Sequence, residues 1–106
     1  MKRIPVKEYL SFLNEGLKHI LIDVRSDVEI ESGMIDNAVH LPLHDLNKKL
    51  LEMDAEEIQH IVFYCRSGYR SLSACDIAAK IWGTSKEYYS LDGGILAWHE
   101  SQKVLL

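Results

Sequence analysis

The chain lacks the features that mark several large classes of protein. Its 106 residues include only two cysteines and two prolines, and its uninterrupted apolar runs are only a few residues long. Two cysteines are too few for a disulfide framework, and a membrane-spanning helix needs about 20 consecutive apolar residues. We find no internal repeat, linker or low-complexity tract. The sequence therefore predicts one globular domain, residues 1–106, with no membrane contact.

An excess of basic charge is absent too. With 12 lysines and arginines against 16 acidic residues, the net charge is −4, which does not favour a nucleic-acid partner. Lys2 and Arg3 open the chain, but no signal-like apolar stretch follows them, so we expect a cytoplasmic protein. Neither cysteine belongs to a Cys-x-x-Cys pair, and no histidine pair stands at zinc-ligand spacing beside them. We therefore expect no metal site.

Strand-like and helix-like segments alternate along the chain. Short apolar or β-branched runs predict strands at residues 19–24, 38–41, 61–64 and 88–91. Apolar residues at helical spacing predict helices at residues 5–15, 43–53, 72–82 and 95–100. Ser26 and Glu29 form a capping-box pattern that predicts a further short helix, closed by Gly33. This alternation predicts an α/β fold: a small, mostly parallel central sheet with helices on both faces, and ligands beyond the carboxyl ends of its strands.

One loop combines several features of a reactive site. Cys65 directly follows the buried strand at 61–64 and precedes a helix, whose N-terminus presents unpaired N–H groups and a positive dipole. Arg66 and Arg70 add two cations, with no acidic residue between Cys65 and Arg70. Gly68 allows successive N–H groups to converge on one point. The loop therefore predicts a cysteine of lowered pKa that acts as a nucleophile toward a small oxyanion.

Other interpretations of the cysteines must be weighed. A cysteine at the end of a strand is most often a small buried apolar residue, and we expect that role for Cys75 on the packed face of the following helix. A cysteine phosphatase or arsenate reductase of related fold needs five residues between cysteine and arginine to enclose a phosphate. Only four separate Cys65 from Arg70, so the loop length disfavours that alternative.

Four stretches of the chain together carry a family resemblance. They are residues 21–25 (LIDVR), 29–42 (EIESGMIDNAVHLP), 65–70 (CRSGYR) and 91–98 (LDGGILAW). In this order and spacing they resemble the single-domain rhodanese family, whose members are of the thiosulfate sulfurtransferase type. The chain departs from the family at Met34, where the family commonly has histidine.

The resemblance implies a site and a reaction. Cys65 would take up sulfur as a persulfide, Arg66 and Arg70 would bind the anionic donor, and Asp23 and Arg25 would support the surrounding loops. The terminal sulfur would be held by the backbone N–H groups of Arg66, Ser67, Gly68, Tyr69 and Arg70.

The implied enzyme is a sulfurtransferase that needs no cofactor. It would take sulfane sulfur from thiosulfate or a similar small anionic donor and pass it to cyanide or a thiol. A protein could also serve as donor or acceptor. The alternative from another functional class is a persulfide-carrying or docking module that serves a dedicated partner protein.

Overall fold

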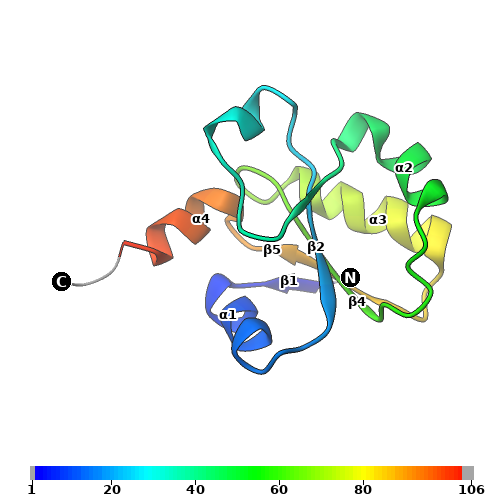
Figure 1. Cartoon of the computed structure of the whole chain (residues 1–106), viewed down its shortest axis with the longest axis horizontal. Coiled ribbons are helices and arrows are strands. Elements are labelled where there is room, and N and C mark those ends of the chain that lie inside the picture. Colours follow the sequence, from blue (N-terminus) through cyan, green and yellow to red (C-terminus); the bar gives the residue numbers. More distant parts are fainter. Residues whose placement is uncertain (1, 104–106) are drawn as a thin grey trace.

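Five parallel strands form the central sheet of the computed structural model, which describes residues 2–103 (Figure 1). The strands are β1 (Lys2–Ile4), β2 (His19–Asp23), β3 (Val39–His40), β4 (His60–Tyr64) and β5 (Glu87–Leu91). Their order across the sheet is β1-β5-β4-β2-β3, and every neighbouring pair is parallel. The predicted α/β class, with a parallel sheet at its centre, is confirmed.

Four α-helices connect these strands in the described part of the chain. They are α1 (Val6–Asn14), α2 (Leu46–Glu52), α3 (Arg70–Trp82) and α4 (Gly94–Ser101). Two 3-10 turns, Glu29–Ser32 and Leu43–Asp45, lie in the segments on either side of β3. Within residues 2–103 none of the helices has the length and apolar character that crossing a bilayer requires.

The alternation of side chains along the strands divides the core into two layers. On β4, Ile61 and Phe63 face one layer, whereas Val62 and Tyr64 face the other. The first layer is closed by α2 and α3, and the second by α1 and α4. Helices therefore cover both faces of the sheet, as the sequence predicts. Because β4 is buried on both faces, Cys65, the residue that follows it, lies in the interior of the protein.

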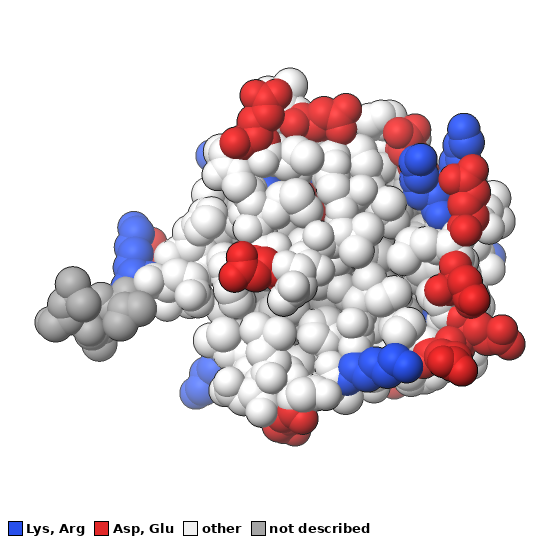
Figure 2. Space-filling model, viewed as in Figure 1, with Lys and Arg blue, Asp and Glu red and all other residues white. Residues whose placement is uncertain are grey.

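One strand was not predicted from the sequence. β1 is only three residues long and pairs with β5, with Ile4 opposite Leu91. It places a fifth strand at the edge of the sheet, beside α1. The surface carries scattered charges of both signs, and neither sign covers the face shown in Figure 2.

Candidate active site

The sulfur of Cys65 lies at the carboxyl edge of the sheet, between β4 and the first turn of α3. The Cys65 side chain is only 1% exposed and forms no disulfide. Its Sγ atom accepts a hydrogen bond from the Gly68 N–H at 3.1 Å, and Ser71 Oγ lies 3.6 Å away. Gly68 has a φ of +110°, a conformation that favours glycine, and this turns its N–H back toward the sulfur.

Opposing effects act on the pKa of the Cys65 thiol. Burial disfavours the thiolate and would by itself raise the pKa. Hydrogen bonds from the Ser71 hydroxyl and from the N–H groups of Ser71, Gly68 and Arg70 favour the thiolate. The donors outweigh burial, so the pKa of Cys65 lies below that of an ordinary thiol. Such a lowered pKa is the chemical requirement for a cysteine nucleophile at neutral pH.

A pair of buried hydroxyl groups, those of Ser71 and Ser90, lies next to the Cys65 sulfur. Ser71 Oγ lies 2.6 Å from Ser90 Oγ on β5, and both residues are at most 1% exposed. A thiolate can accept the Ser71 O–H, and Ser71 Oγ can then accept the Ser90 O–H. The hydrogen-bond chain then ends on the sulfur. Neither serine was among the predicted site residues. Ser71 could have been found from its place beside Arg70, but Ser90 has no local signal.

The N-terminus of α4 fixes the other side of the loop. The Ile95 N–H donates to the Cys65 carbonyl at 2.9 Å, and the Leu96 N–H donates to the Arg66 carbonyl at 3.2 Å. Gly94 has a positive φ, and a Cβ atom there would overlap both carbonyl oxygens. The predicted turn at Gly93 and Gly94 thus acts on the cysteine loop, because it occupies the loop's carbonyls and leaves its N–H groups for the sulfur.

Asp23 and Arg25 form a buried ion pair at the end of β2. The Arg25 guanidinium donates to Asp23 through Nε at 3.0 Å and through Nη2 at 2.7 Å. The same Nη2 group donates to the Gly33 carbonyl at 2.7 Å. The pair therefore ties β2 to the end of the 3-10 turn, a placement that suits the supporting role expected of it.

Arg70 is bound to a residue that was not predicted for the site. Its Nη1 and Nη2 groups donate to the two carboxylate oxygens of Glu29, at 2.6 and 2.8 Å. The Arg70 guanidinium holds the pKa of Glu29 at about 2. The predicted capping box is also present, because Glu29 Oε1 accepts the Ser26 N–H and Ser26 Oγ accepts the Glu29 N–H.

The remaining loop side chains point away from such partners. Arg66 is exposed, and within residues 2–103 no carboxylate lies at ion-pair distance from it. Ser67 is exposed as well, and Tyr69 is 75% exposed. A contribution of Ser67 or Tyr69 to the site would therefore come from the backbone N–H rather than from the side chain.

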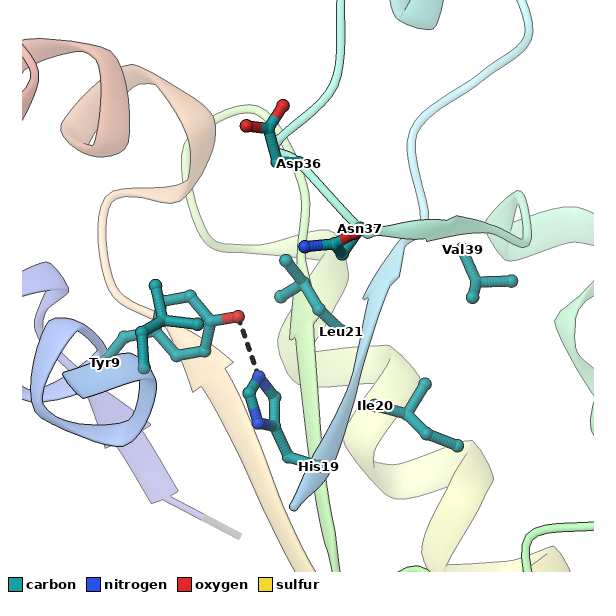
Figure 3. Close-up of a pocket in the computed structure, with 8 residues that line it drawn as sticks. Tyr9, His19, Ile20, Leu21, Asp36, Asn37 and Val39 are labelled. Carbon is teal, nitrogen blue, oxygen red and sulfur yellow. Dashed lines mark hydrogen bonds between the residues drawn. The ribbon is translucent and has the colours of Figure 1, made fainter. Parts of the chain in front are cut away.

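A second hollow lies on the α1 side of the sheet, and Figure 3 shows its lining. The Tyr9 hydroxyl donates to His19 Nε2 at 2.9 Å, and His19 Nδ1 donates to the Leu17 carbonyl at 2.7 Å. Burial raises the pKa of Tyr9 to about 12. Both polar rings are thus already paired, and the hollow is lined by neither of the two cysteines. Across residues 2–103, no cluster of three or more potential ligand side chains could hold a metal ion.

The fold and the loop define an α/β protein with a cysteine set in a ring of backbone amides. Residues 6–101 match the family model described as Rhodanese-like domain. The chain belongs to this family. The named sequence resemblance is thereby confirmed.

Known relatives cover most of the chain. A sulfurtransferase of Allochromatium vinosum is 38% identical over 79 residues, 74% of this chain and 70% of the relative. A thiosulfate sulfurtransferase of Pseudomonas syringae is 34% identical over 98 residues, 92% of this chain and 86% of the relative. Among solved structures, the human single-domain sulfurtransferase is 29% identical with a TM-score of 0.72, covering 92% of this chain and 95% of that one.

Proposed function

We propose that this protein is a sulfurtransferase in which Cys65 carries sulfur as a persulfide. The observation that carries the proposal is the ring of donors around the Cys65 sulfur, which lowers its pKa in a fully buried position. The relatives support the same reaction class, since the names of those described above are sulfurtransferase names.

The first half-reaction loads the cysteine. The Cys65 thiolate attacks the outer sulfur of thiosulfate, or of a similar sulfane donor, and a new S–S bond forms. The bond between that sulfur and the sulfonate group breaks, and sulfite leaves with the electron pair. The persulfide then carries its negative charge on the terminal sulfur. N–H groups of residues 66–70 stabilise that charge as the Gly68 N–H stabilises the thiolate.

The second half-reaction transfers the terminal sulfur from Cys65 to an acceptor. A nucleophilic acceptor, cyanide or a thiolate, attacks the terminal sulfur, and Cys65 departs as a thiolate. A thiol of lower pKa is a better leaving group in such an exchange. The donors that activate Cys65 for loading therefore also promote unloading. Both steps use only the side chain and the loop, with no cofactor.

A second candidate is a persulfide-carrying module that serves a partner protein. Two large apolar side chains favour it: Tyr69 within the cysteine loop is 75% exposed, and Val28 beside Glu29 is 74% exposed. Tyrosine is enriched at protein–protein interfaces, so Tyr69 is the side chain through which a partner would contact the loop. The chemistry at Cys65 would be unchanged, but free thiosulfate would be a poor donor.

Intact-mass analysis before and after incubation with thiosulfate, followed by cyanide, tests the proposal. We expect a gain of one sulfur atom that maps to the Cys65 peptide and disappears with cyanide. A Cys65→Ala variant should show no gain, and Cys75→Ala serves as the matched control that still gains sulfur. No gain in the native protein, while Cys65 remains alkylatable at neutral pH, would contradict thiosulfate transfer and favour the carrier module.

A further inference from the structure

The arginine that closes the cysteine loop is not available as a free cation. Both terminal nitrogens of Arg70 are occupied by the Glu29 carboxylate, and the pair is partly shielded, with side chains 37% and 27% exposed. A bidentate pair of this kind is geometrically specific as well as strong. The Glu29 carboxylate therefore neutralises the positive charge of Arg70.

Glu29 is itself held in place by the backbone. Its Oε1 atom accepts the Ser26 N–H at 3.0 Å as well as Arg70 Nη1, while its own N–H donates to Ser26 Oγ. With a pKa of about 2, the carboxylate stays ionised throughout the physiological pH range. Glu29 is thus a fixed anion, and Arg70 cannot turn toward a donor without leaving an ionised carboxylate behind.

The charges around Cys65 then nearly cancel. Arg25 is paired with Asp23, and Arg70 is paired with Glu29, which leaves Arg66 as the unpaired guanidinium of the loop among residues 2–103. Arg66 and Glu29 line the same hollow beside the loop, so the fixed anion lies close to the unpaired guanidinium. Besides Arg66, the loop offers its backbone N–H groups to an anion, and His99 lines the same hollow.

Donors differ sharply in the charge that they bring to this site. Thiosulfate carries two negative charges and meets a thiolate, so three charges gather at the reacting atoms. An organic persulfide, R–S–SH, reacts in its protonated, uncharged form. The thiolate attacks its terminal sulfur, the S–S bond breaks, and R–S⁻ leaves with the electron pair, so one charge is present throughout.

On the basis of the proposed sulfur transfer, we propose that Glu29 determines donor specificity. By holding Arg70, it leaves one unpaired guanidinium at the loop and disfavours dianionic donors relative to organic persulfides. Glu29 is a positioning residue that acts through Arg70.

The test compares second-order rate constants for sulfur uptake by Cys65 from thiosulfate and from an alkyl persulfide. In Glu29→Gln, glutamine preserves the capping box but removes the ion pair. The freed Arg70 should raise the thiosulfate constant roughly tenfold, and much more than the persulfide constant. Its thiosulfate rate should also fall more steeply with added salt. The matched control is Glu31→Gln, which removes an exposed charge nearby without releasing Arg70.

An Arg66→Gln variant supplies an independent test, since that side chain is exposed and, among residues 2–103, has no ion-pair partner whose loss could unfold the protein. We expect roughly a tenfold loss with thiosulfate and a far smaller one with the persulfide. A thiosulfate-to-persulfide ratio that falls or stays constant in Glu29→Gln, or stays constant in Arg66→Gln, overturns the inference. If neither donor adds sulfur to native Cys65, the proposed function itself fails.

Discussion

The two cysteines of this chain share one core but have opposite chemistry. Cys65 and Cys75 are each 1% exposed, and both pack in the layer closed by α2 and α3. Yet the pKa of Cys65 is lowered, whereas burial raises the pKa of Cys75 to about 12. Burial disfavours both thiolates, so burial alone cannot explain the difference.

The difference comes from the position of each cysteine relative to α3. Cys65 precedes the helix, where the first N–H groups have no partner within the helix and can bind the sulfur. Cys75 lies in the second turn, where the N–H groups are used by the helix itself. In residues 2–103 no hydrogen bond reaches the Cys75 sulfur. Cys65, just before α3, and Cys75, within it, therefore have opposite pKa shifts although they lie only ten positions apart.

The largest contrast is expected when each cysteine is removed. Cys65→Ala should reduce sulfur transfer to the rate of the uncatalysed reaction, because no other group can form the persulfide. Cys75→Ala should keep the rate within about twofold and cost about 1 kcal/mol of stability through lost packing. Steady-state assays and thermal unfolding of the two variants measure these effects. Equal activity losses would show that Cys75 takes part in the chemistry.

Alkylation of the native protein should separate the two thiols by about a thousandfold or more at pH 7, since their pKa values lie on opposite sides of 9. Because the native pKa of Cys65 is lowered, its alkylation rate should rise with pH and level off earlier than that of a free thiol. Peptide mapping after a short pulse of iodoacetamide gives both rates. In denaturant the alkylation rates of the two cysteines should become equal. If they still differ there, the cause is the residues adjacent to each cysteine in the sequence and not the folded structure.

Gly94→Ala should disrupt the arrangement of backbone N–H groups around the Cys65 sulfur, although Gly94 lies outside the cysteine loop. A Cβ atom at this position overlaps the carbonyls of Cys65 and Arg66, so the loop must shift. We expect sulfur uptake to fall about a hundredfold and stability to drop by about 2–4 kcal/mol. Gly16→Ala is the control, because Gly16 has a similar positive φ but nothing within 4 Å of a Cβ atom. If both variants lose activity equally, backbone strain rather than overlap is responsible.

The hydroxyl pair should have the smallest effect. Ser71→Ala removes the hydroxyl donor to the Cys65 sulfur, so the pKa of Cys65 should rise and its alkylation at neutral pH should slow about tenfold. Ser90→Ala should give the same shift at about a third of that size, since Ser90 acts through Ser71. The exposed Ser73 on the same helix provides the control, Ser73→Ala. A pH profile of Cys65 alkylation that does not move in Ser71→Ala would exclude this role.

Structural features that depend on residues close together in the chain could be predicted from the sequence. The strand–loop–helix context of Cys65, the turn at Gly68 and the capping box of Ser26 and Glu29 all depend on spacings of a few residues. The structure contains each of these features. The strands are also correctly placed to within a residue or two, because buried β-branched runs have little choice of conformation.

The parts that sequence reasoning missed depend on contacts between distant segments. Glu29 and Arg70 are 41 residues apart, and Ser71 and Ser90 are 19 apart, so periodicity does not reveal either pair. β1 becomes a strand only because Ile4 pairs beside Leu91, since three residues before a proline have no strand signal of their own. These contacts follow from the order of strands, which the one-dimensional pattern does not specify.

The contact between α4 and the cysteine loop also governs when the thiol becomes reactive during synthesis. A growing chain that has reached Leu91 already contains Cys65 and β4, but it lacks the N–H groups of Ile95 and Leu96 that hold the loop carbonyls. Without these two hydrogen bonds, we expect the loop to be less ordered and the pKa of Cys65 to be closer to that of an ordinary thiol. We therefore expect the lowered pKa of Cys65 to arise late in folding, after α4 has formed.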